Sequence, residues 1–276
     1  MSPGDESKSR PLKNHYDTNY GNFQSELYSQ IRLEAFGEDI GQNSWLTAQE
    51  YDTFIGWLDL SSGKTLLDVG CGSGGPALRA AARTGCSVVG IDLHEHAIST
   101  ARQLASERHL EGRAEFSVVN ATTQLPFPDA RFDAITCIDA INHLPNRPEV
   151  IGELARLLRS GGRLLFTDPV TVTGPLTNAE IAVRSSIGFF LFVPRDYDEH
   201  VLADCGFRLL LCKNVTSNMA EIAEKRRAAR EPRSAALRQI EGDQTFEDQQ
   251  NFLTVTARLA GESRLSRFVY VSEKIG

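Results

Sequence analysis

The chain has 276 residues, a formal net charge of -7 and 41% hydrophobic side chains. A chain of this length can bury one sizeable core, which is compatible with a single α/β domain that carries insertions. The negative charge argues against a general nucleic-acid surface, since such surfaces are normally basic. No apolar stretch approaches the roughly 18 residues that indicate a membrane span. The polar residues 1–10 lack the apolar core of a secretory signal, which points to the cytoplasm.

The cysteines are few and scattered. They are Cys71, Cys86, Cys137, Cys205 and Cys212, and their spacing matches neither C-x-x-C nor a His/Cys cluster. We therefore expect small buried thiols and predict no metal site.

The N-terminal region falls into two parts. Residues 1–13 are charged and poor in apolar side chains, so we expect disorder there. Residues 14–60 concentrate aromatic side chains, and we predict a helical cap. Its rings can simply pack onto the sheet. Alternatively, one or two of them face a bound molecule, because an aromatic face can contact a cation; the candidates are Tyr16, Tyr20 and Trp45.

The stretch 64–76 reads as strand, turn and helix. Thr65 to Val69 is an apolar run, a glycine-rich turn follows, and Pro76 suits the first position of a helix. Glycines 70, 72 and 75 also fit the G-x-G-x-x-G pattern of a dinucleotide site, so a nicotinamide-dependent oxidoreductase is one alternative. Asp68 argues against it, because a carboxylate there repels phosphate and attracts a cation.

With Asp68, this motif resembles the first motif of the class I S-adenosylmethionine-dependent methyltransferases, which has an acidic-x-G-x-G-x-G form. The resemblance implies that the turn wraps the methionine half of the cofactor and that Asp68 helps to hold its ammonium group. The turn residues assigned to S-adenosyl-L-methionine in this way are Gly70, Cys71, Gly72 and Gly74.

The next strand, Ser87 to Ile91, ends at Asp92, twenty positions beyond Gly72. A carboxylate there can accept hydrogen bonds from both ribose hydroxyls, and we place Leu93 beside it in the cofactor site. The alternative is that Asp92 caps the following helix.

A third strand, Phe116 to Val119, leads to Asn120 and Ala121, where the family commonly has an acidic residue and a small one beside the adenine ring. Asparagine departs from that pattern, although its carbonyl can still accept a bond from the adenine amino group. A fourth strand runs through Ile138, which we also assign to the cofactor.

Asp139 and His143 follow the fourth strand, where open α/β sheets place reacting groups. We predict that both face the cleft, as substrate ligands or as a base, since the ordinary pKa of histidine is close to neutral. Alternatively, the segment lines the cofactor and His143 only orders the loop.

The regular alternation of strands and helices predicts a doubly wound, seven-stranded, mostly parallel sheet, the Rossmann-like methyltransferase fold. We place the cofactor-binding core at 61–216, a helical insertion that serves as lid or oligomer contact at 217–262, and the last strand at 263–276. The insertion begins with a basic run that includes Arg226, Arg227 and Arg230, which we interpret as a solvated helix.

The resemblance implies direct displacement of a methyl group onto a small-molecule acceptor by a monomer or homodimer, with no nucleic-acid or membrane partner. We expect an amine nitrogen as acceptor atom, since short motifs are similar to bacterial glycine-betaine-pathway and phosphoethanolamine N-methyltransferases. The alternative is carbon or oxygen methylation of a more apolar, quinone- or isoprenoid-like acceptor, with Phe189 and Phe192 in the pocket wall. A protein that binds the cofactor without catalysis is the remaining hypothesis.

Overall fold

The structure, a computed structural model, describes residues 13–276. The predicted disordered segment therefore lies, except for its last residue, outside the described residues. Three helices precede the sheet, namely α1 (Lys13–Gly21), α2 (Glu26–Phe36) and α3 (Ala48–Gly56). Ser25 and Thr47 cap α2 and α3 by accepting a backbone N–H of the first turn, which explains where these helices begin.

The sheet has the predicted doubly wound, mostly parallel topology. Its strands run in the order β3-β2-β1-β4-β5-β8-β7, and the short β6 pairs with the end of β5. Among the strands of residues 13–276, β8 alone runs opposite to the others, antiparallel to β5 and to β7. The strands are β1 (Thr65–Val69), β2 (Ser87–Asp92), β3 (Ala114–Val118), β4 (Phe132–Ile138), β5 (Leu158–Val172), β6 (Val193–Pro194), β7 (Phe207–Asn214) and β8 (Leu265–Lys274).

Strand β5 spans 15 residues and contains Pro169. It continues past Pro169 because the pairing with β8 shifts register between Asp168 and Thr171. Proline lacks the N–H that a regular ladder needs, so a shift at this point lets the strand resume beyond it.

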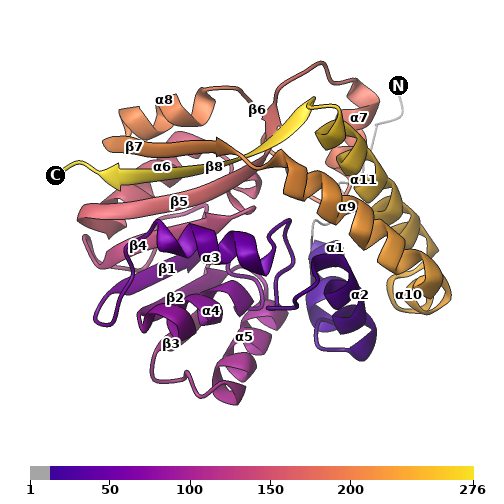
Figure 1. Ribbon diagram of the computed structural model, residues 1–276, viewed down its shortest axis with the longest axis horizontal. Coiled ribbons are helices and arrows are strands. Elements are labelled where there is room, and N and C mark those ends of the chain that lie inside the picture. Colours follow the sequence, from indigo (N-terminus) through magenta and orange to yellow (C-terminus); the bar gives the residue numbers. More distant parts are fainter. Residues whose placement is uncertain (1–12) are drawn as a thin grey trace, which may run out of the picture.

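Helices cover both faces of the sheet, as period-two alternation requires. Leu66 packs in a cluster with α3, α4 (Gly75–Thr84) and α5 (Glu95–Glu107), whereas its neighbour Leu67 packs in a cluster with α6 (Arg147–Leu157) and α8 (Tyr197–Asp204). Figure 1 shows the resulting layers.

A separate helical layer lies beside the sheet. It consists of α9 (Thr216–Arg230), α10 (Ser234–Glu241) and α11 (Asp243–Gly261), with the short α7 (Asn178–Arg184) nearby. Figure 1 shows α9 to α11 gathered on the same side as α1 and α2. Two apolar clusters join α2 to this layer.

The interpretation of α9 as a solvated helix is wrong. Met219, Ile222 and Ala223 are fully buried, and Arg230 is 6% exposed. The basic composition of the run concealed a narrow apolar face that packs against α2 and α11. No helix within residues 13–276 is long and apolar enough to cross a membrane.

Candidate active site

A cavity of about 760 Å³ opens at the carboxyl ends of β1, β2 and β4. The parallel strands bring these ends to one edge of the sheet, so motifs far apart in the sequence meet there. Residues of α1, the loop before α3, the segment 187–190, α9 and α11 complete its wall. Its volume lies in the upper part of the ~300–1,000 Å³ range of small-molecule sites.

The turn after β1 forms part of the cavity wall. Gly72 has φ +53, and a Cβ there would lie 3.0 Å from the Tyr20 hydroxyl. Gly70 has φ +70, and a Cβ there would lie 2.5 Å from Cβ of Ala140. Glycine is required at both positions, because only glycine adopts these angles freely and leaves the space open. Gly70, Cys71 and Gly72 line the cavity, whereas Gly74 does not; a Cβ at Gly74 would instead meet Phe116 at 2.9 Å.

Asp92 lies at the end of β2, lines the cavity and is 8% exposed. Its Oδ2 accepts the N–H of Gly72 at 2.9 Å, and its Oδ1 accepts the N–H of His94 at 3.0 Å. Asp92 does not cap α5, whose N-cap is His94, although it accepts the N–H of that residue, and each carboxylate oxygen keeps a further lone pair for a ligand. Burial raises the pKa of Asp92.

Asp68 lies at the end of β1 and is 4% exposed on the same cavity. Its Oδ1 accepts the Thr136 hydroxyl at 2.8 Å. Burial raises the pKa of Asp68 to about 7, the Thr136 hydrogen bond opposes this shift, and the nearby Asp92 adds to it. A bound cation would favour the ionised form.

Four further residues predicted for the cofactor site also line the cavity. They are Leu93, Asn120, Ala121 and Ile138. The Asn120 carbonyl already accepts the N–H and the hydroxyl of Thr122, at 3.0 and 2.8 Å. These bonds fix the turn and leave the amide N–H₂ of Asn120, rather than its carbonyl, as the more available group.

His143 is held between two partners. Its Nδ1 lies 2.8 Å from the carbonyl oxygen of Phe189, and its Nε2 lies 3.2 Å from the Tyr16 hydroxyl. A carbonyl only accepts, so Nδ1 carries the proton and Nε2 accepts from Tyr16. Burial lowers the pKa of His143 to about 4, and the ring is neutral at pH 7 with its basic nitrogen on the cavity side. The pKa of Tyr16 is raised by burial to about 12.

Asp139 lines the cavity, but its carboxylate is engaged within the protein. Oδ1 accepts from the Thr167 hydroxyl and from Nε of Arg267, both at 2.7 Å. Oδ2 accepts the N–H of Trp45 at 3.0 Å. Asp139 also has φ +50, a strained conformation for a residue other than glycine. These contacts suit a role in positioning the segment 139–143 better than a role as a base.

Glu50 completes this buried group, because Nη1 of Arg267 contacts both of its carboxylate oxygens at 2.9 and 2.8 Å. Arg267 is 0% exposed. The group ties the ends of β4 and β5 to β8 and α3, and it therefore fixes the floor of the cavity.

Not all of the predicted aromatic residues line the cavity. Tyr16, Tyr20, Trp45 and Phe189 line the cavity. Phe192 does not: it packs with Val170, Val255 and Leu265, so its assignment to the pocket wall is wrong. In the segment before β6, Phe189 and Phe190 lie in the wall, whereas Phe192 packs toward α11 and β8.

The polar wall residues that sequence reasoning missed include Asn142, Arg226 and Gln249. Asn142 and Gln249 are 0% and 2% exposed. Asn142 directly precedes the predicted His143, which was the only local signal for it. Arg226 and Gln249 come from the helical layer, whose packing over the cavity no sequence motif indicated.

Comparisons with known proteins agree with this geometry. Residues 60–188 match the family model described as a methyltransferase domain. The chain is 33% identical over 175 residues to the 27-O-demethylrifamycin SV methyltransferase of Amycolatopsis mediterranei, which covers 60% of this chain and 62% of that protein. It is 34% identical over 144 residues to the sterol 24-C-methyltransferase erg6 of Schizosaccharomyces pombe, which covers 52% of this chain and 36% of that protein.

The same fold occurs in the cyclopropane synthase MmaA2 of Mycobacterium tuberculosis, with a TM-score of 0.79 at 19% identity over 97% of this chain and 100% of that chain. The fold and the site at the ends of β1, β2 and β4 define a nucleoside-cofactor domain of the Rossmann-like type. The matched domain and the fold together are those of Rossmann-like methyltransferases. The chain spans 62% and 36% of the length of the two curated relatives above.

Proposed function

We propose that the chain transfers the methyl group of S-adenosyl-L-methionine to a hydroxyl oxygen of a small molecule with an apolar body. The observation that carries this proposal is the neutral His143, with its Nε2 directed to a hydroxyl group in the cavity. An alcohol or phenol loses a proton during methylation, so the reaction needs an acceptor for that proton.

The cavity fits S-adenosyl-L-methionine, the cofactor that the matched methyltransferase domain implies. The glycine turn leaves open space where side chains would intrude. Asp68 is a buried carboxylate, and an ammonium group there would remove the cost of its ionisation. Asp92 has spare lone pairs for the ribose hydroxyls, and Asn120 and Ala121, proposed to contact the nucleobase, line the same cavity with Leu93. When bound, the cofactor supplies an electrophilic methyl group on a sulfonium.

The chain's own contribution is positioning and proton acceptance. Trp45, Phe189, Phe190 and Phe252 provide an apolar wall that orients the acceptor and excludes water. Such positioning is worth up to roughly 7–11 kcal/mol in favourable cases. A hydroxyl that approaches His143 replaces the Tyr16 hydroxyl as donor to Nε2, and this nitrogen then takes the proton.

An amine acceptor, the first expectation from the sequence, has less support. A cationic amine should meet a free carboxylate, yet Asp139 has both oxygens engaged. Asp68 and Asp92 belong to the proposed cofactor site, and Glu95 begins α5 beside it. Arg226 lies in the same wall and repels a cation.

Carbon methylation is the second candidate, and the apolar wall favours it. The relative from Schizosaccharomyces pombe is named as a C-methyltransferase. Carbon methylation of an alkene also needs a base for the departing proton, but it needs no hydroxyl on the acceptor.

The test is an acceptor screen with the purified chain and S-adenosylmethionine, in which S-adenosylhomocysteine is measured. Phenols and alcohols with apolar bodies, the matched amines and the matched alkenes form three arms. Turnover confined to the hydroxyl arm supports the proposal. Turnover confined to either of the other arms contradicts it, and binding of the cofactor without turnover in any arm favours the non-catalytic hypothesis.

A further inference from the structure

Arg226 is a cation in the cavity wall without a counter-charge. Within the part of the chain that the structure describes, it has no carboxylate partner, and its guanidinium lies 5.4 Å from the centre of the Trp45 ring. Burial lowers the pKa of Arg226 to about 10. This shift reflects the cost of burying a charge that no anion compensates.

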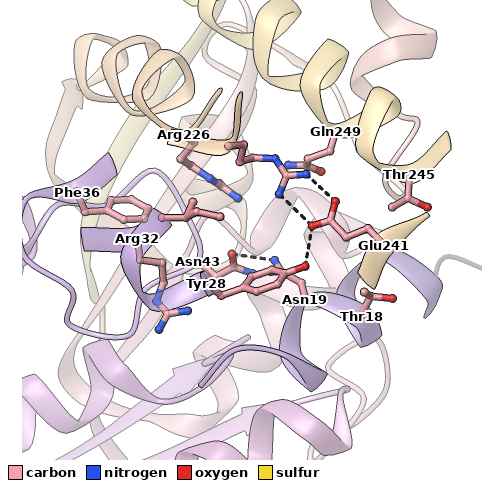
Figure 2. A pocket seen from close by; sticks show the side chains of 12 residues that line it. Thr18, Asn19, Tyr28, Arg32, Phe36, Asn43, Arg226, Glu241, Thr245 and Gln249 are labelled. Atoms are coloured by element: carbon pink, nitrogen blue, oxygen red, sulfur yellow. Dashed lines mark hydrogen bonds and ion pairs between the residues drawn. The ribbon is translucent and has the colours of Figure 1, made fainter. Parts of the chain in front are cut away.

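The arginine one turn further along the same helix, Arg230, has a carboxylate partner. Arg230 donates to both oxygens of Glu241 at 3.0 and 2.6 Å, and Glu241 also accepts the Tyr28 hydroxyl at 2.6 Å. Figure 2 shows these contacts as dashed lines around Glu241, whereas the labelled Arg226 has none. The helical layer therefore neutralises one arginine and leaves the other available to the cavity.

Two buried amides stand in the same wall. Among the described residues 13–276, neither Nδ2 nor Oδ1 of Asn142 has a hydrogen-bond partner, although the side chain is 0% exposed. Oε1 of Gln249, 2% exposed, also lacks one. A buried polar group without a partner costs about 1–3 kcal/mol. Such groups are expected where a ligand supplies the missing partner.

A second arginine lies behind the aromatic wall. Arg184 is 0% exposed, and its guanidinium lies 4.4 Å from the centre of the Phe252 ring and 5.2 Å from that of Phe190. Its Nη1 donates to the Thr256 hydroxyl at 2.8 Å, while Nε and Nη2 have no partner. Arg184 adds positive potential behind the rings that face the cavity.

We propose that the acceptor carries a carboxylate that docks on Arg226, with Asn142 and Gln249 as neutral hydrogen-bonding groups in the same chamber. This inference rests on the proposed function, because it assigns the acceptor class of that site. A single guanidinium in direct contact matches a single negative charge, and its planar fork can bind a carboxylate through two parallel hydrogen bonds. The substrate class is thus an apolar hydroxy acid.

The test measures binding, independently of turnover. The protein saturated with S-adenosylhomocysteine is titrated calorimetrically with hydroxybenzoate, hydroxycinnamate and hydroxynaphthoate, and with the carboxamide of each. At least one acid should bind about tenfold or more tightly than its carboxamide, as loss of a charge-assisted pair implies. Equal binding, tighter binding of the carboxamides, or no binding in any pair contradicts the proposal.

Variants locate the anion site. Arg226→Gln, which keeps a long polar side chain, should abolish the preference for the acid. Arg227→Gln is the matched control. Arg227 is on the same helix but does not line the cavity, and its guanidinium pairs with Glu224 at 2.8 Å. It should retain the full preference. Thermal unfolding of both variants verifies folding.

Two outcomes distinguish an error in the anion site from an error in the proposed function. If Arg226→Gln weakens S-adenosylhomocysteine and leaves the acid preference intact, Arg226 holds the carboxylate of the cofactor and the inference is wrong. If the acid binds through Arg226 but is not methylated at oxygen, the anion site stands and the proposed function is wrong. Tighter binding of the matching phosphomonoester than of the carboxylate also overturns the carboxylate assignment.

Discussion

The Tyr16 hydroxyl lies 3.2 Å from Nε2 of His143, across 127 positions of the chain. The Phe189 carbonyl fixes the proton on the other ring nitrogen. The first helix, the loop after β4 and the segment before β6 therefore meet at one imidazole. This arrangement places a basic nitrogen beside the aromatic rings of Tyr16 and Phe190.

His143→Gln tests the base directly. Glutamine keeps a hydrogen-bonding side chain but cannot take up the proton, so kcat should fall about 10²–10⁴-fold. The dissociation constant of S-adenosylhomocysteine should change little, since the ring contacts no residue assigned to the cofactor. A kcat within a few fold of the native value would remove His143 from the chemistry. Tyr16→Phe removes the hydroxyl that donates to Nε2 but keeps the imidazole as base, so its effect on kcat should be much smaller.

The low pKa of His143 predicts the pH profile of kcat. The neutral base is populated above its pKa of about 4. With both substrates saturating, kcat should therefore be flat from about pH 5.5 to pH 8. A decline below a midpoint near the ordinary pKa of histidine, about 6.5, would show that the ring is not held neutral.

Asp68 should couple cofactor binding to pH. Its pKa of about 7 means that a large fraction is protonated in the free protein below pH 7. An ammonium group binds the ionised form better, so affinity for S-adenosylhomocysteine should rise as pH increases from 5.5 to 7 and level off above. The slope is at most about tenfold per pH unit. Calorimetry in buffers of different ionisation enthalpy measures the proton that is released.

Asp68→Asn should bind more weakly at pH 7.5 and show a flatter profile. If the native protein and Asp68→Asn have the same pH dependence, the ammonium group does not lie beside Asp68.

Asp92→Ala should weaken S-adenosylhomocysteine binding, because it removes two charge-assisted hydrogen bonds of about 1.5–3 kcal/mol each. The variant also loses the contacts to the N–H groups of Gly72 and His94, so the turn itself loosens. Asp129→Ala, a surface carboxylate with a side chain 77% exposed, is the control. Unchanged affinity in Asp92→Ala would mean that the ribose lies elsewhere.

Arg147, Asp168 and Asp198 form a buried charge cluster on the face of the sheet that α6 and α8 cover. This cluster should control the free energy of unfolding. Nη2 of Arg147 contacts Asp168 at 2.9 Å, and Nη1 contacts Asp198; the exposed fractions of these side chains are 0%, 0% and 1%. Arg147→Met strands two buried carboxylates and should lower the free energy of unfolding by about 3–5 kcal/mol at pH 8. Arg159→Met, at a half-exposed pair with Asp133, should cost only about 0–1 kcal/mol.

The sign of the pH effect follows from the raised pKa values of these carboxyls. Burial raises the pKa of Asp168, and it raises that of Asp198 to about 7 even beside Arg147. The ordinary pKa of an aspartate carboxyl in the unfolded chain is about 3.9. Between that pH and about pH 7, these carboxyls are therefore protonated in the native state of Arg147→Met but ionised in its unfolded state. The deficit measured by urea unfolding should be smaller at pH 5 than at pH 8. An equal deficit would mean that the carboxyls are already solvated.

The fold could be predicted because its signals are local. Alternating valine-rich strands and helices, with glycines at the turns, prescribe parallel crossovers that leave few topologies. Asp68 and Asp92 follow from the same rule, since each ends a strand at the shared edge and lines the cavity. Even the register shift near Pro169 has a local cause.

The acceptor half of the cavity could not be predicted, because its geometry is tertiary. Arg226 and Arg230 look alike in the sequence, and only the distant Glu241 separates a neutralised arginine from an available one. Asp139 was expected to face the substrate, but Arg267 and Thr167 engage it from strands that follow much later. Phe192 was expected in the wall, but it turns toward α11 instead.

The most direct test of the account supplies methyl-labelled S-adenosylmethionine to the native protein with equal amounts of a hydroxycinnamate and the matching aminocinnamate. Nuclear magnetic resonance then locates the transferred label. The account predicts a labelled methoxy carbon, formed in step with S-adenosylhomocysteine and lost in His143→Gln. A label on nitrogen or on a ring carbon, with none on oxygen, would contradict it.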